Sequence, residues 1–248
     1  MQIFGIFKEQ YELEYLTKCY VYLNKDEEDK IDTDTLNLLL KKKNKNVAGT
    51  IFLYNPFTAP IGYDKNEKLL EQGYKFTDKF VELQDDDAIR IVAKNLKAYA
   101  GKLVEIKYLF NYNKDNIQPT SALEVFDMDI EKLHTNQLTV FSKQHNFQDY
   151  KNISYNGKFI FFAWGHKFEK SLKNISLYSS NISQWALKAG KDIGFIYDGS
   201  QDEAGSFEYT KFMSPVAHGK LKLVIPNALH EVFSKEHIKP FCIKDMLT

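Results

Sequence analysis

The sequence contains few of the features that mark secreted, membrane-bound or zinc-binding proteins. Its 248 residues include only two cysteines, Cys19 and Cys242, which lie near opposite ends of the chain. This small number and wide spacing argue against a disulfide framework and against a cysteine-based zinc site. No apolar run approaches the roughly 20 residues that a membrane helix needs. Residues 1–9 also carry an acidic side chain too early for a secretory signal. The composition therefore predicts a cytoplasmic protein without a membrane partner.

The chain also lacks an excess of charge of either sign. Lysine plus arginine and aspartate plus glutamate number 33 each, which gives a formal net charge of zero. Any contact with a nucleic acid must therefore be local, because the molecule as a whole does not attract a polyanion. A basic run lies at residues 41–46. Such a run is typical of a solvated turn before a buried strand, and a nucleic-acid contact is the alternative.

Apolar runs alternate with helical patterns along most of the chain. The runs that predict buried strands occupy residues 47–54, 103–110, 158–164, 193–197 and 221–225. Acidic residues before residues 88–99 predict a capped helix, and residues 170–190 have helical apolar spacing. Two shorter runs at residues 11–16 and 19–23 predict a hairpin. The pattern predicts a single α/β domain with a mostly parallel central sheet flanked by helices and an N-terminal hairpin extension.

The common catalytic motifs are absent from the sequence. It has no glycine-rich phosphate loop, no Gly-x-Ser-x-Gly elbow, no His-Glu-x-x-His helix and no paired cysteines, so neither a cofactor nor a metal is expected. Ligands of parallel sheets bind where the loops gather at the carboxyl ends of the strands. Four segments at predicted strand exits or in a late loop are therefore informative, namely residues 53–57, 108–111, 162–167 and 213–220.

In their order along the chain, these four segments resemble motifs of the uracil-DNA glycosylase superfamily. A first strand there ends in a polar residue followed by proline, a second ends in Leu-Leu-Asn, a third ends in Leu-Trp-Gly, and a late loop reads His-Pro-Ser-Pro-Leu. The chain is also similar to a little-characterised bacterial family with an Asn-Pro-Ser-Thr-Ala turn and an Ala-Trp-Gly strand end. Asn55-Pro56-Phe57-Thr58-Ala59 and Ala163-Trp164-Gly165 carry that second similarity.

The resemblance covers a core of residues 47–225 and leaves residues 1–46 as an N-terminal extension. It implies a uracil-DNA glycosylase-like fold and a cofactor-independent DNA glycosylase, with a monomer favoured. Such an enzyme flips a damaged or modified base out of DNA and hydrolyses its N-glycosidic bond, leaving an abasic site. The spacing between Gly165 and Ser214 exceeds that of compact members of the family, so residues 191–210 are interpreted as an insertion near the cleft.

By this resemblance, Asn55 would orient the attacking water, and Asn111 would bond the edge of the flipped base. Phe57 or Tyr63 would stack on that base. Asp127, or its neighbour Asp129, would serve as general base if the Asn55 amide cannot. Structural alternatives stay open for all of these residues: an Asx turn at Asn55, loop or helix capping by Asn111 and the two aspartates, and core packing by Phe57.

The late loop would grip the DNA backbone. Ser214 and Pro215 match the family's Ser-Pro pair, and Lys220 and His166 are further candidates for phosphate contacts. The family's preceding His-Pro pair is replaced by Phe212-Met213, so the histidine that stabilises the departing base is missing from its usual place. His218 could substitute for it.

This departure leaves two further functions open beside the enzyme. One is a catalytically inactive module of the same fold that binds a nucleic acid or a nucleotide. The other is a protein-interaction domain such as an inhibitor. For the enzyme, the altered late loop argues against plain uracil as the necessary substrate. A hypermodified base of phage DNA, removed in antiviral defence, is the hypothesis that follows.

Overall fold

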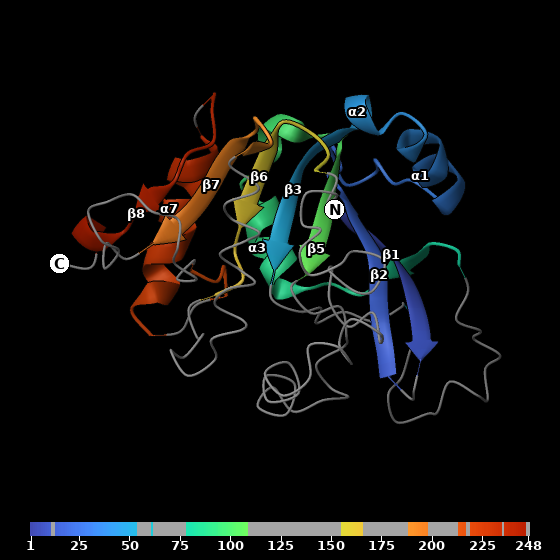
Figure 1. Ribbon diagram of the computed structural model, residues 1–248, viewed down its shortest axis with the longest axis horizontal. Coiled ribbons are helices and arrows are strands. Elements are labelled where there is room, and N and C mark those ends of the chain that lie inside the picture. Colours follow the sequence, from blue (N-terminus) through green and yellow to red (C-terminus); the bar gives the residue numbers. More distant parts are fainter. Residues whose placement is uncertain are drawn as a thin grey trace.

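The computed structural model describes about half of the chain. The described residues are 1–10, 13–53, 61, 78–108, 155–165, 188–197, 213–216, 219–234 and 236–246. They form an eight-stranded sheet with helices against both of its faces (Figure 1). The α/β class predicted from the sequence is thereby confirmed.

Most of the sheet is parallel. Its strands are β1 (Gln2–Gln10), β2 (Leu13–Tyr22), β3 (Val47–Leu53), β4 (Val81–Leu83), β5 (Leu103–Tyr108), β6 (Phe159–Phe162), β7 (Asp192–Tyr197) and β8 (Phe241–Cys242). They lie side by side in the order β4-β1-β2-β5-β3-β6-β7-β8. Neighbouring strands from β5 to β8 are parallel, whereas β4, β1, β2 and β5 pair antiparallel.

The interior strands are apolar on both faces. Every residue of β3 and of β6 is buried, as expected for central strands of a parallel sheet covered on both sides. On one face, side chains of these strands pack against helices α3 (Asp87–Ala93) and α7 (Leu221–Phe233). The other face meets α1 (Thr33–Leu40) through Leu36, which packs among residues of β1, β2 and β5.

Two helices begin at aspartate caps. The Asp86 carboxylate accepts a hydrogen bond of 3.0 Å from the Ile89 amide at the start of α3, and Asp32 accepts one of 2.7 Å from the Thr35 amide at the start of α1. Such caps stabilise a helix by about 0.5–2 kcal/mol. The capped helix predicted over residues 88–99 is thus confirmed, although α3 ends at Ala93. The short helix η2 (Lys97–Tyr99) follows it.

Short helices complete the described structure. They are α2 (Lys43–Asn46), which precedes β3 directly, and η5 (Lys244–Met246), which follows β8. Among the described residues, no helix combines the length and the apolar composition that crossing a bilayer would take.

The N-terminal hairpin differs from the one predicted. Residues 11–16 and 19–23 were expected to be its two strands, but the described parts of both runs lie in or directly after the single strand β2. The partner of β2 is β1, in a register that places Gln2 opposite Tyr22. Both faces of β1 are buried near its start, so its residues do not alternate between polar and apolar. The sequence pattern therefore did not predict this strand. Since β2 also pairs with β5, residues 1–46 contribute to the central sheet.

One prediction in the C-terminal half also requires correction. Residues 221–225 are the start of α7 and not a strand. The apolar run there suggested a strand, whereas the helix continues through the exposed Pro226 and buries Ala228, Leu229 and Val232 with helical spacing. Within residues 191–210, interpreted as an insertion, residues 192–197 form β7, which lies between β6 and β8 in the sheet.

A buried carboxylate crosslinks the middle of the sheet. Glu105 of β5 is 7% exposed, and its Oε1 lies 3.3 Å from the Lys107 ammonium and 3.2 Å from the Tyr20 hydroxyl that donates to it. Its Oε2 accepts a hydrogen bond of 2.7 Å from the Asn156 side-chain amide and lies 3.5 Å from the Thr50 hydroxyl. The carboxylate thereby joins β2, β3 and β5 to the segment that enters β6.

Replacement of this carboxylate is expected to destabilise the fold. Glu105→Ala should lower the free energy of unfolding by about 3–5 kcal/mol, because it leaves the Lys107 ammonium, the Tyr20 hydroxyl and the Asn156 side-chain amide without this acceptor. Urea denaturation followed by circular dichroism measures the change. Arg90→Ala, which breaks the exposed Arg90–Asp87 pair, is the control and should cost less than about 1 kcal/mol. Equal losses in the two variants would contradict the role of Glu105.

The two cysteines differ in accessibility. Cys19 is buried in β2 beside β5, where the Tyr108 hydroxyl donates a hydrogen bond of 3.9 Å to its Sγ, and burial raises the pKa of the thiol. Cys242 in β8 is partly exposed. Because only the thiolate reacts with alkylating reagents, the folded protein should have one reactive cysteine.

Thiol labelling tests this difference. At mildly alkaline pH we expect a thiol reagent to modify Cys242 and to reach Cys19 only in denaturant, as read by peptide mass spectrometry. Cys242→Ser should leave the folded protein unreactive. Labelling of folded Cys242→Ser at the wild-type rate would show that Cys19 is accessible.

Candidate functional site

Three adjacent strands deliver their following segments to one edge of the sheet. In the parallel register of β3 with β5, Leu53 lies beside Tyr108, the last described residue of each strand. In the register of β3 with β6, Phe52 lies beside Phe162, and the Ala163 amide donates a hydrogen bond of 2.8 Å to the Phe52 carbonyl. The segments that begin after β3, β5 and β6 therefore leave from neighbouring points of the carboxyl edge (Figure 1).

The chain changes direction across the sheet at β3. After β3 it forms β5 on one side, and later it forms β6 on the other side, so β3 and β6 flank a topological switch point. The crevice outside the carboxyl ends of such a strand pair is where open α/β sheets bind their ligands. In the sequence, Asn55 and Pro56 follow one of these two strands, and Trp164 and Gly165 follow the other.

The late loop reaches the same edge. The Met213 amide donates a hydrogen bond of 2.8 Å to the Ile196 carbonyl near the end of β7. Gly165 has a φ of +93°, and a Cβ at this glycine would lie 3.6 Å from the Ser214 Cβ. The third and fourth segments of the sequence motif thus meet, and Gly165 occupies a left-handed conformation that other residues rarely adopt.

The predicted backbone-contact residues that are described lie on this loop or just after it. Ser214 is half-buried, and its hydroxyl accepts a hydrogen bond of 3.2 Å from the Val216 amide. Pro215 is buried, which leaves it little surface for a ligand. Lys220 is exposed at the start of α7. Of the three, Ser214 and Lys220 have surface to offer a phosphate.

Buried aromatic rings pack around the ends of β3 and β6 at the switch point. The ring of Phe52 lies 5.6 Å from Phe162, 5.7 Å from Tyr155 and 6.1 Å from Trp164, measured between centroids. Phe162 and Trp164 lie 4.8 Å apart. Such pairs contribute about 0.5–1.5 kcal/mol each beyond the area they bury, so the cluster gives the switch point a rigid base.

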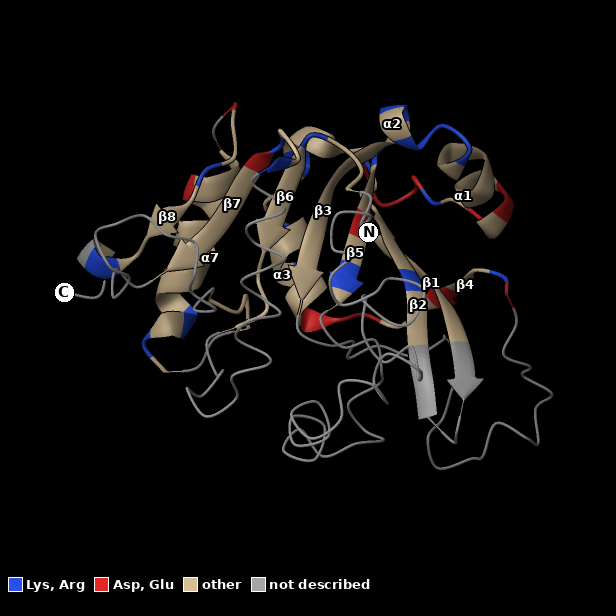
Figure 2. Ribbon diagram, in the orientation of Figure 1, with Lys and Arg blue, Asp and Glu red and all other residues tan. Residues whose placement is uncertain are grey.

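One charged pair at this edge was missed by the sequence analysis. Lys107, next to the last residue of β5, lies beside Phe52 in the sheet register and pairs with the buried Glu105. Figure 2 shows a basic segment of the ribbon near the carboxyl end of β5. The signal in the sequence was a Glu-x-Lys pair inside an otherwise apolar strand, which is unusual unless the charges neutralise each other.

The other predicted site residues lie outside the described residues. They are Asn55, Phe57, Tyr63, Asn111, Asp127, Asp129, His166 and His218. For Asn55, Asn111 and His166 the structure establishes where the preceding strands end, since each follows β3, β5 or β6 within a few residues. Within the described part of the chain, no group of three or more His, Cys, Asp or Glu side chains could hold a metal ion.

Comparisons with protein-family models, with curated proteins and with solved structures found no match to this chain. The convergence of strand ends at the switch point is therefore the basis on which its function has to be argued.

Proposed function

We propose that this protein is a DNA N-glycosylase that hydrolyses the glycosidic bond of a flipped, modified base and works as a monomer in the cytoplasm. The observation that carries the proposal is the switch point between β3 and β6. The four segments that resemble uracil-DNA glycosylase motifs begin at, or pass beside, this one edge of the sheet. If the Asn-Pro and Trp-Gly pairs had arisen by chance, they would not be expected to follow two adjacent strands of the sheet.

The proposed chemistry needs neither a metal nor a cofactor. The bond between the sugar C1′ and the base nitrogen breaks first, and the base leaves as an anion with the bonding electrons. A water oxygen then adds to C1′, and the proton that the water loses ends on the released base. Asn55 would orient that water, since an amide is a weak base but suffices where the sugar has already gained oxocarbenium character. Asp127 is the alternative as general base. Asn111 would bond the base edge, with Phe57 or Tyr63 stacked on its face.

The late loop is proposed to hold the DNA backbone. The Ser214 hydroxyl and the exposed Lys220 ammonium can both donate to phosphate oxygens, with His166 as a further donor. Because Ser214 lies against Gly165, a phosphate held by the loop would lie close to the exit of β6. These contacts are few, which agrees with the net charge of zero.

One observation favours a catalytically inactive binding module as the second candidate. In the family motif a histidine and a proline precede Ser-Pro, whereas Phe212 and Met213 stand here. Met213, at the proline position, is 6% exposed and packs in the main core. Phe212 stands at the histidine position, and its hydrocarbon ring has no proton to donate to a departing base. His218 is the nearest following residue that could donate one. If it does not, the module would bind DNA or a nucleotide without cleaving it.

Base release is the test that separates these functions. We expect the protein to release free base and to leave alkali-labile abasic sites in DNA that carries the right modified base. The panel should include uracil and hypermodified pyrimidines in single and double strands, with mass spectrometry of the released base. Salt-dependent binding with unchanged DNA throughout would support the inactive module. If the protein shows neither DNA binding nor base release, both candidate functions are overturned.

Asn55→Ala should reduce base release by about a hundredfold or more, because the water would no longer be held in line with the sugar. The measurement is a single-turnover rate on the best substrate of the panel. Asn37→Ala, at an exposed position of α1, is the matched control and should retain the wild-type rate. A full rate for Asn55→Ala would exclude Asn55 from the reaction and leave Asp127→Asn as the next variant to measure.

A further inference from the structure

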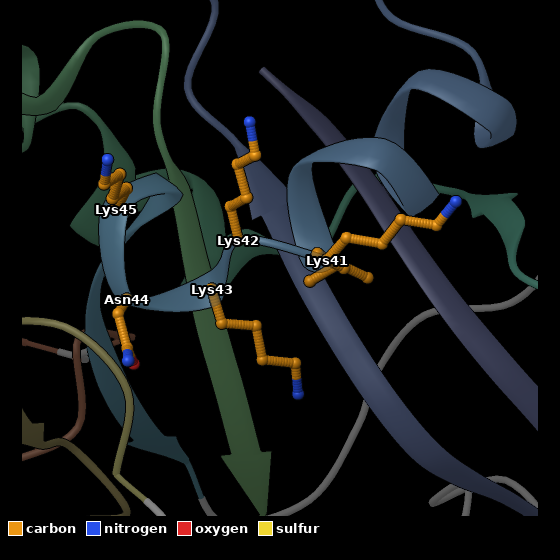
Figure 3. Close-up of a pocket in the computed structure, with 6 residues that line it drawn as sticks. Lys41, Lys42, Lys43, Asn44 and Lys45 are labelled. Carbon is orange, nitrogen blue, oxygen red and sulfur yellow. The ribbon is translucent and has the colours of Figure 1, made fainter.

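A basic hollow lies between α1 and α2. It has a volume of about 480 Å³ and is lined by Leu40, Lys41, Lys42, Lys43, Asn44 and Lys45 (Figure 3). Lys41, Lys42 and Lys45 are exposed, and no ion pair within the described residues engages them. This hollow, hereafter the α1–α2 patch, therefore concentrates positive charge on a protein whose overall charge is zero.

The patch has a defined backbone scaffold. The Lys102 ammonium donates a hydrogen bond of 2.8 Å to the Lys45 carbonyl, which ties the end of α2 to the start of β5. The Lys43 ammonium lies 5.5 Å from the centre of the Tyr20 ring. The Asn46 side-chain amide donates a hydrogen bond of 2.9 Å to the Leu39 carbonyl and closes the turn between the two helices. The three exposed lysines thus project from an anchored turn.

Nearby acidic residues do not cancel this charge. Asp32 and Asp34 lie at the opposite end of α1, whose eight residues span roughly 12 Å. That separation exceeds the Debye length of about 8 Å at physiological ionic strength. The negative end of the α1 dipole, in contrast, favours the lysines that follow it.

The side chains of the patch diverge. In Figure 3, Lys41, Lys42 and Lys43 extend in three different directions and do not converge on a common point. A single phosphate ion would be held by converging donors, whereas a polymer with a charge at every nucleotide can meet ammonium groups that are spread apart. The geometry therefore fits the backbone of a nucleic acid better than a small anion.

We propose that the α1–α2 patch is a nucleic-acid backbone site separate from the carboxyl edge. It adjoins the amino end of β3, whereas the candidate active site lies beyond the carboxyl end of the same strand (Figure 1). The seven residues of β3 separate the two by about 23 Å. The patch would hold DNA without reading its sequence. It would bind a different stretch of the polymer from the one at the carboxyl edge, whether or not that edge is occupied. This inference goes beyond the proposed function and does not require base release.

Salt-dependent binding tests the proposal. The wild-type protein should bind a fluorescently labelled DNA duplex without modified bases, with an affinity that falls as salt rises. In the triple variant Lys41→Gln/Lys42→Gln/Lys45→Gln, the slope of log affinity against log salt should become shallower by about 2 to 3, since each neutralised phosphate contributes roughly 0.9. Fluorescence anisotropy at several salt concentrations gives the slope.

Two control variants separate an effect that is specific to the patch lysines from the effect of a lower total charge or of a lost fold. Lys18→Gln/Lys239→Gln/Lys244→Gln removes the same charge from exposed positions elsewhere and should keep the wild-type slope. The variant Lys41→Arg/Lys42→Arg/Lys45→Arg should keep both the fold and the slope. An unchanged slope in the patch variant, an equal loss in the control, or no binding by the wild type would overturn the proposal. Base release by the patch variant at saturating DNA should stay at the wild-type rate, so the two proposals can fail separately.

Discussion

The parallel pairing of β3 with both β5 and β6 is the constraint on which the rest of the structure depends. It buries every side chain of β3 and aligns the carboxyl ends of three strands at one edge. Because the chain forms β5 on one side of β3 and later forms β6 on the other, that edge contains a topological switch point, which no local interaction could create. The aromatic cluster around Phe52 and the Glu105 network stabilise the same three strands. Core stability and site geometry thus rest on the same contacts.

Among the described residues, charge is distributed unequally between the two ends of this sheet. The described part of the carboxyl edge includes Lys107, which pairs with the buried Glu105, and Lys220, which precedes α7. The amino edge carries the α1–α2 patch, whose lysines have no acidic partner among the described residues. A net charge of zero therefore conceals a locally basic surface. On our proposals, the carboxyl edge performs chemistry on one base and the amino edge retains the polymer by electrostatic attraction alone.

Much of the sheet could be predicted from the sequence, for reasons that particular residues make plain. The runs that became β3, β5, β6 and β7 are apolar because a central parallel strand is covered on both faces. Residues 221–225 have the same local composition, yet they form a helix because the core requires Ala228, Leu229 and Val232 on one side. β1 was missed because its buried start has no alternation. In both cases the contacts that determine the structure involve residues far away in the sequence. The local sequence pattern therefore could not predict the correct secondary structure.

The sequence by itself determined which residues can be buried, where α3 is capped, and which polar side chains follow the strands. It also determined the order of the four motif segments. Only the tertiary structure decided that β3 and β6 are neighbours, that Gly165 meets Ser214, and that the lysines of the α1–α2 patch lie at the edge opposite the motifs. The physical reason is that strand order arises from long-range backbone pairing, whose hydrogen bonds are the same for every sequence. The choice among possible orders is made by the packing of whole faces, which no short segment encodes.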